Sequence, residues 1–199
     1  MEKIVGLYKM EVFKRSAVVW MVFQGILWVV FGITCLMNPD AWGNAPEPKG
    51  VVSNFHNLFG TFLFIFGNNL LLSLIIVLGN VFVRFGAVTP GLLILMVQGV
   101  MIGSVAGANS FEIPFRSIAE ANIQFLKVGL WETTAYALIC GVTLTKSLHI
   151  ADTFPAKQWS EVRRFKELHF STTEKVYLLV SIFLLGLAAY IEAIYLTRM

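Results

Sequence analysis

Charged side chains are scarce in this chain. Only 14% of its 199 residues are Asp, Glu, Lys or Arg, whereas 57% are hydrophobic. A soluble domain carries roughly 25% charged residues, so this composition excludes an ordinary water-soluble fold. The net charge of +3 is small, and it does not suggest nucleic-acid binding.

Residue types typical of catalytic and metal sites are also few. The two cysteines, Cys35 and Cys140, both lie within apolar runs, so a disulfide framework is not expected. His56, His149 and His169 do not have the spacing of metal ligands. The chain has no Gly-rich phosphate loop, nucleophile elbow or paired carboxylates. We therefore expect no catalytic residues, no cofactor and no metal.

Long apolar runs are what the chain does have. Five of them approach the ~20 residues that a helix needs to cross a ~30 Å hydrocarbon core. They cover residues 16–37, 58–83, 88–107, 128–145 and 175–196. These runs predict an all-α, polytopic membrane bundle of about five transmembrane helices, built as a single integral membrane domain over residues 1–199.

Positive charge is divided unevenly between the two sides of such a bundle. Four basic residues fall on the side of the C-terminus: Lys49, Arg116, Lys127 and Arg198. The other eleven of the 15 lie on the side of the N-terminus. By the positive-inside rule, this bias predicts a cytoplasmic N-terminus and an external C-terminus.

Three segments outside the apolar runs are predicted to form short helices on the membrane surface. Residues 1–15 have apolar side chains at helical spacing, although they could also simply extend the first span. Residues 108–127 place Phe111, Phe115 and Ile118 on one helix face, with Pro114 in the first turn; a partly re-entrant helix and a connecting loop are the alternatives.

The cytoplasmic loop, residues 146–174, is predicted to contain the third surface helix. Its apolar residues share one helix face: Trp159, Val162, Phe165 and Leu168. The basic part of this loop, residues 157–166, could contact anionic lipid or a protein partner, or it could simply be a solvated face.

Small residues recur every four positions in two of the apolar runs. The first ridge is formed by Gly99, Gly103 and Gly107, and the second by Gly129, Thr133, Ala137 and Gly141. Because small residues let membrane helices approach closely, we expect the third and fourth spans to pack along these ridges. In the first span, Gln24, Gly25 and Gly32 are expected to mark the packing face.

A polar cluster is expected inside the apolar runs, and its members are Asn68, Asn69, Gln98 and Glu132. A carboxylate in hydrocarbon needs a partner, a water-filled cavity or a bound proton. We therefore expect Glu132 to face protein, within reach of Asn68 or Asn69. Asn69, Ser73 and Asn80 share one helix face, which should point into the bundle. The cluster could hold the bundle together or line a transport path.

The order of short motifs in the chain resembles the stage II sporulation protein M family. The residues that carry the resemblance are Phe66-Gly67-Asn68-Asn69-Leu70, Gly86, Thr89, Gln98-Gly99 with Gly103, and Gly129-Leu130-Trp131-Glu132 with Ala135. The family typically has an Asn-Gly pair where this chain has Gln98-Gly99. The resemblance covers roughly residues 17–195 and implies a five-span protein that acts within a membrane complex. In spore formers, the namesake looks like a scaffold that recruits wall-remodelling hydrolases during engulfment.

These observations predict a non-catalytic scaffold or accessory subunit of a larger complex. It would be a multi-pass protein of a bacterial or archaeal inner membrane, with the lipid bilayer and other membrane subunits as partners and no nucleic acid. The alternative is a transporter or channel subunit with a polar intramembrane path around Glu132 and Asn68/Asn69.

Overall fold

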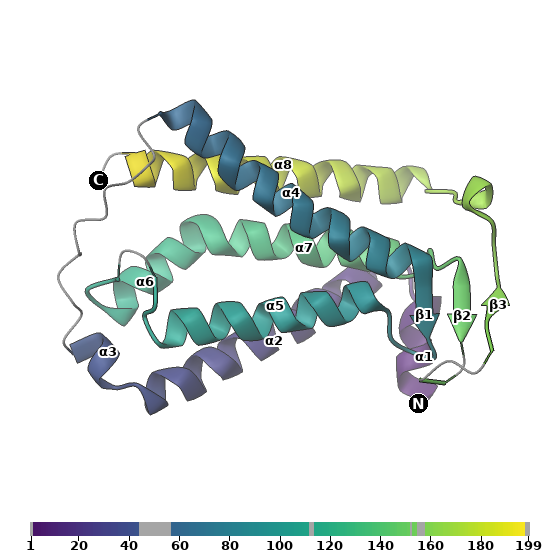
Figure 1. Cartoon of the computed structure of the whole chain (residues 1–199), viewed down its shortest axis with the longest axis horizontal. Coiled ribbons are helices and arrows are strands. Elements are labelled where there is room, and N and C mark those ends of the chain that lie inside the picture. Colours follow the sequence, from purple (N-terminus) through teal and green to yellow (C-terminus); the bar gives the residue numbers. More distant parts are fainter. Residues whose placement is uncertain (1, 44–56, 112–113, 152, 155–157, 198–199) are drawn as a thin grey trace.

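Long helices lie side by side in one bundle, with the N-terminus and a small β-sheet at one end and the C-terminus at the other (Figure 1). The structure, a computed structural model, describes residues 2–43, 57–111, 114–151, 153–154 and 158–197. Its α-helices are α1 (Glu2–Lys9), α2 (Val12–Met37), α3 (Asp40–Gly43), α4 (Leu58–Phe82), α5 (Pro90–Gly107), α6 (Ile118–Gln124), α7 (Leu130–Thr143) and α8 (Thr172–Thr197).

Four of these helices, α2, α4, α5 and α8, are long and apolar enough to cross a membrane. They confirm the helices predicted over residues 16–37, 58–83, 88–107 and 175–196, with ends shifted by a few residues. The start of α5 has a clear cause, because the Thr89 side chain caps Leu92 N at 3.2 Å and Pro90 opens the first turn.

The remaining predicted span differs most from the structure. α7 has 14 residues, but a π-helical turn, Phe125–Gly129, joins it to α6. The helical chain therefore runs unbroken from Ile118 to Thr143. Hydropathy alone missed its first ten residues because the segment before residue 128 contains polar side chains.

The glycine ridge of α5 packs against α2. A Cβ added at Gly103 would lie 2.5 Å from the Leu27 carbonyl oxygen, and one at Gly107 would lie 2.6 Å from the Phe31 carbonyl oxygen. The expected pairing of this ridge with α7 is therefore wrong. A ridge of small residues shows that a neighbour comes close, but its sequence does not identify the neighbour.

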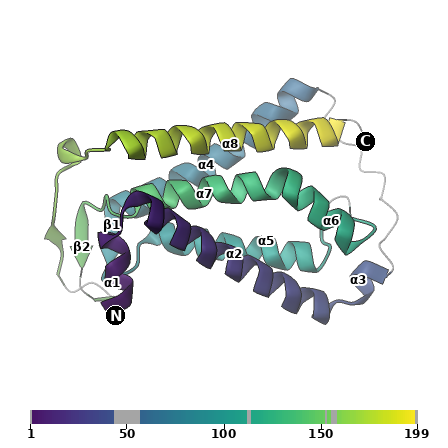
Figure 2. The same cartoon turned by 180° about the vertical axis from the view of Figure 1, so that it is seen from behind.

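The ridge on α7 also faces α2 rather than α5. A Cβ at Gly141 would lie 2.4 Å from the Ser16 hydroxyl, while Ala137 is fully buried in the core. Gly129 instead lies against the ring of Phe125, one turn earlier in its own helical run. As a result, α2 crosses the bundle beside both α5 and α7 (Figure 2).

Only part of the packing face expected for α2 is correct. Gln24 is 7% exposed, as expected for a residue that faces the bundle. Gly25 and Gly32 have no other atom within reach of an added Cβ, so they lie on the open face of the helix. Successive helical residues are about 100° apart, which is enough to separate Gln24 from Gly25.

The first surface segment forms a separate helix, α1, instead of extending the first span. The Tyr8 hydroxyl donates to the Ala87 carbonyl at 3.1 Å, and the Arg84 guanidinium carbon lies 4.3 Å from the Tyr8 ring centroid. Burial raises the pKa of Tyr8 to about 12, although the Arg84 charge acts in the opposite direction. The phenol therefore stays protonated near neutral pH, and its hydrogen bond holds α1 against the end of the bundle.

A three-stranded sheet closes this end of the bundle. β1 (Val83–Phe85) pairs in parallel with β2 (His149–Ala151), which pairs antiparallel with β3 (Ser160–Glu161). The basic amphipathic helix expected around residues 159–168 is therefore wrong, since only one 3₁₀ turn, Phe165–Glu167, forms there. Apolar residues at every third position fit a helix face, but pairing with β2 and the contact between Trp159 and Phe85 decide the structure.

The segment at the opposite end is helical only in its second half. α6 begins at Ile118, where the Ser117 side chain caps it. Before it, the Asn109 side chain holds Phe115 through both backbone groups, accepting from its N–H and donating to its carbonyl at 2.9 Å each. The expected helix start near Pro114 is therefore wrong, because Pro114 and Phe115 are not helical and the Asn109 side chain occupies both backbone groups of Phe115.

We predict that Gly103→Ala destabilises the bundle by about 1–3 kcal/mol, because its methyl group would overlap the α2 backbone. Gly25→Ala is the matched control, since its methyl group enters open space and should be neutral or stabilising by about 0.5–1 kcal/mol. Unfolding of the two variants in mixed detergent micelles measures the difference. Equal stabilities would contradict the packing of α5 on α2.

Candidate functional site

Glu132 lies in the first turn of α7, directly after the π-helical turn Phe125–Gly129. Its carboxylate accepts a hydrogen bond of 2.8 Å from the hydroxyl of Tyr136, one turn further along the same helix. Tyr136 is completely buried. Single π-helical turns inside α-helices are frequent at functional sites.

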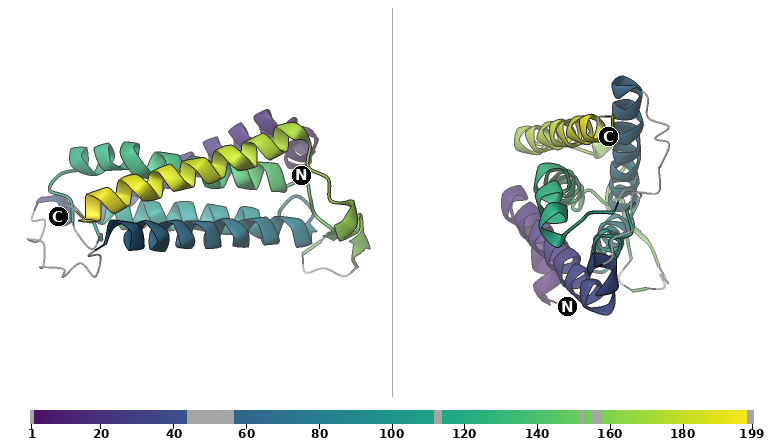
Figure 3. Two further views of the ribbon diagram at one scale, coloured as in Figure 1. Left: turned by 90° about the horizontal axis from the view of Figure 1, so that it is seen from above. Right: turned by 90° about the vertical axis from the view of Figure 1, so that its left-hand side faces the viewer.

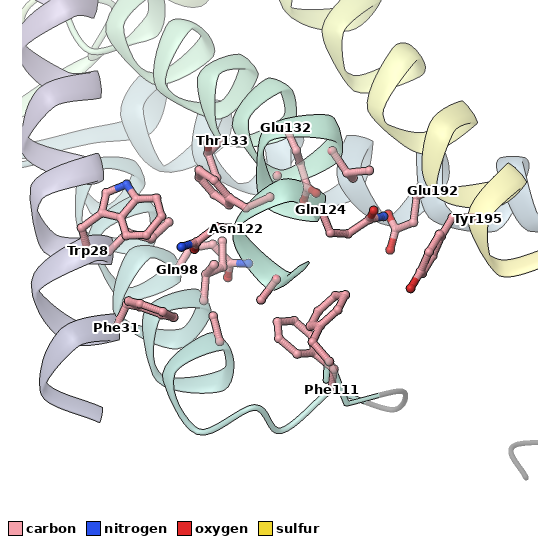
Figure 4. Close-up of a pocket in the computed structure, with 18 of the residues that line it drawn as sticks. Trp28, Phe31, Gln98, Phe111, Asn122, Gln124, Glu132, Thr133, Glu192 and Tyr195 are labelled. Carbon is pink, nitrogen blue, oxygen red and sulfur yellow. The ribbon is translucent and has the colours of Figure 1, made fainter. Parts of the chain in front are cut away.

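A cavity of about 420 Å³ lies beside Glu132. Residues of α2, α5, α6, α7 and α8 line it, together with the π-helical turn. Glu132 from α7 and Glu192 from α8 both point toward this space, and Gln98 and Asn122 also line it (Figure 4). The wall is otherwise largely aromatic and aliphatic, so the carboxylates and amides are the groups that could orient a bound molecule.

Only two members of the predicted polar cluster share this cavity, namely Gln98 and Glu132. Asn68 is exposed on the outside of α4, and neither Asn68 nor Asn69 lines the cavity or hydrogen-bonds Glu132 among the described residues. The expected contact of Glu132 with this amide pair is therefore wrong. α4 crosses α7 obliquely, so the two helices diverge toward the end of α7 where Glu132 lies (Figure 1).

Hydrogen bonds from α2 fix the rotation of α7 about its axis. The Gln24 amide donates to the Thr133 hydroxyl at 2.9 Å, and the Trp20 indole donates to the Thr134 hydroxyl at 3.0 Å. These threonines directly follow Glu132 in the chain. The pair of bonds therefore keeps the carboxylate turned away from α2 and toward the cavity. The sequence marked Gln24 as a packing residue but gave no signal for the Trp20–Thr134 bond.

Asn80 joins three segments near the sheet. Its amide nitrogen donates to the Thr143 hydroxyl at 2.8 Å, and its amide oxygen accepts from the Thr89 hydroxyl. The Ser147 hydroxyl donates to its backbone carbonyl at 2.7 Å. Together with Asn69 and Ser73, Asn80 is buried, which confirms the inward-facing polar stripe on α4. The amide nitrogen of Asn69 is buried and has no hydrogen-bond partner among the residues that the structure describes.

A buried ion network ties α2 and α8 together at the same end. Glu174 in the first turn of α8 lies 2.7 Å from the Lys146 ammonium and 3.7 Å from the Arg15 guanidinium. Arg15 also donates to the Gly141 carbonyl of α7. The three charged side chains are only 5–11% exposed. The sequence placed Arg15 and Lys146 only among the basic residues on the side of the N-terminus, although their position beside the ends of apolar runs was a usable signal.

The basic segment 157–166 lies at the sheet end, and its Lys157 is outside the described residues. Arg164 is 79% exposed and lies 3.8 Å from Glu161. Phe165 and Trp159 are also exposed, at 69% and 48%. Exposed aromatic rings beside cations are typical of a surface that rests on lipid headgroups.

The part of the chain that the structure describes contains no cluster of candidate metal ligands. No group of three or more His, Cys, Asp or Glu residues there could hold a metal ion. The cavity beside Glu132 combines carboxylates, amides and aromatic rings, a set suited to binding and positioning.

The model of the stage II sporulation protein M family matches residues 16–198 of the chain. The chain belongs to this family. The match begins four residues into α2 and includes the cavity, the Asn80 joint, Glu174 and its partner Lys146, but not Arg15. It confirms the resemblance found from the short motifs. Comparisons with curated proteins and with solved structures give no match.

We predict that Glu174→Gln destabilises the bundle by about 3–5 kcal/mol, because Arg15 and Lys146 would then be buried without a counter-charge. Glu161→Gln, which removes the partner of exposed Arg164, is the matched control and should cost about 0–1 kcal/mol. Thermal unfolding in detergent micelles compares the two. Similar losses would show that the buried network does not hold α2 to α8.

Two substitutions of Glu132 separate the effect of its charge from the effect of its hydrogen bond with Tyr136. Glu132→Gln should change stability little, because an amide oxygen can still accept from the Tyr136 hydroxyl. Glu132→Leu should cost about 1–3 kcal/mol, because it leaves that buried hydroxyl without an acceptor. Unfolding of both variants under one set of conditions gives the comparison, and a Leu variant as stable as the Gln variant would refute the structural role.

Proposed function

We propose that this member of the stage II sporulation protein M family is a non-catalytic scaffold or accessory subunit of a larger membrane complex. In this proposal the helical run Ile118–Thr143 is the fifth transmembrane span. The chain is then a multi-pass protein of a bacterial or archaeal inner membrane, with the sheet end and N-terminus in the cytoplasm and the C-terminus outside.

The observation that carries the proposal is the use of polar side chains inside the spans. The side chains of Trp20, Gln24 and Asn80 donate hydrogen bonds to α7 of the same chain. Arg15 and Glu174 pair with each other. Such bonds stabilise a rigid bundle, which is what a subunit that presents surfaces to partners requires.

The same arrangement gives the transport alternative little support. A polar path would need the amides and Glu132 along one channel, yet Asn68 lies on the outside of α4 and Asn80 is enclosed in its joint. Gln98 and Glu132 share a cavity at the end of the bundle away from the sheet. The polar groups are therefore dispersed through the bundle.

Two surfaces are available to partners in this proposal. At the outer end, the cavity between α6 and α8 offers aromatic walls and the carboxylates of Glu132 and Glu192. At the cytoplasmic end, the segment that follows β3 carries Arg164 and Phe165 in exposed positions. This second surface also fits anionic lipid. If it binds such lipid, the purified protein should retain anionic lipid selectively over neutral lipid.

Purification from host membranes tests the scaffold role. The tagged full chain, extracted in mild detergent, should carry at least one different membrane protein in a fixed ratio through affinity and size-exclusion steps. An unrelated polytopic protein with the same tag is the control for non-specific carry-over. A chain that purifies alone, or only with copies of itself, would contradict the proposal.

A further inference from the structure

Asn68 is an exposed amide in the middle of an apolar helix. It lies ten residues after Leu58 and fourteen before Phe82, so roughly 15 Å and 21 Å of helix separate it from the two ends of α4. It makes no hydrogen bond among the described residues of the chain. Where α4 crosses a bilayer, no water reaches this depth, so the amide requires a partner from another molecule.

The residues around Asn68 form a continuous exposed seam. Steps of three and four residues alternate along it: Asn68, Leu71, Ile75, Leu78 and Phe82. The apolar members are each 42–56% exposed. α4 lies at the edge of the bundle, so this face is not covered by the other helices of the chain (Figure 3). Alternating steps of four and three are the contact pattern of a left-handed helix pair.

We infer that α4 pairs in parallel with α4 of a second copy, through this seam and a hydrogen bond between the two Asn68 amides. In heptad terms, Asn68 and Ile75 occupy a positions and Leu71 and Leu78 occupy d positions. A β-branched residue at a with Leu at d favours two parallel strands, and one Asn at an a position fixes the register.

A second copy meets the requirements that the membrane sets for this partner. Copies of one protein insert in one orientation, so a two-fold axis along the membrane normal makes their α4 helices parallel and places both Asn68 residues at one depth. An amide is both donor and acceptor, so two identical amides can satisfy each other. The inference needs α4 to cross the bilayer, but it does not depend on the scaffold role.

Energy transfer between labelled full-length chains in liposomes measures the pairing. The wild type should dimerise, and Asn68→Leu should weaken the dimer about 3- to 30-fold, the equivalent of roughly 0.6–2 kcal/mol for an interhelical hydrogen bond. Asn68→Gln, which keeps an amide, should restore most of the affinity. Because Asn68 is exposed, neither change should alter the melting temperature of the monomer.

Cysteine cross-linking tests the geometry independently. In a Cys35→Ala and Cys140→Ala background, Leu71→Cys should form a disulfide dimer on mild oxidation. Leu63→Cys is the control, because Leu63 is similarly exposed, at 49% against 56%, but lies off the seam. A wild type that stays monomeric at every density, an Asn68→Leu variant that dimerises equally well, or equal cross-linking at both positions would overturn the inference. So would a different protein cross-linked to Leu71→Cys in host membranes.

Discussion

Hydrocarbon offers no hydrogen bonds, and this constraint organises the structure. Every polar group placed within an apolar span must be satisfied by protein, or its burial costs free energy. The chain meets much of this demand through bonds between helices, such as Gln24 to Thr133 and Asn80 to Thr143. Those bonds fix both the spacing and the rotation of the helices, because a hydrogen bond is directional, whereas an apolar contact is not.

Small residues and polar joints act together in this bundle. Gly79 and Gly91 lie in contact where α4 and α5 meet, and the amide of Asn80 would lie 2.4 Å from a Cβ at Gly91. The close approach brings Asn80 within reach of Thr89, and the bond between them closes the α4–α5 connection. Close backbone packing and directional bonding are therefore parts of a single joint.

The sequence predicted the helices better than the contacts between them. Long apolar runs identify α2, α4, α5 and α8, because their length and composition alone decide whether they fit a bilayer. The site was harder to predict, since Glu132 follows a π-helical turn that no residue pattern marks. Its expected contact with Asn68 or Asn69 failed because the angle between α4 and α7 depends on tertiary packing. The sheet was missed because pairing of β1 with β2 joins segments more than sixty residues apart.

The ion network at the sheet end has a consequence for the order in which the bundle can be completed. Arg15 and Lys146 precede their shared counter-ion, Glu174, in the chain. Since chains are made from the N-terminus, both cations leave the ribosome before the carboxylate that neutralises them. They must remain in contact with water or lipid headgroups until α8 arrives. Docking of the last helix therefore closes the sheet end of the bundle, and a chain truncated before Glu174 would retain two cations without their counter-ion.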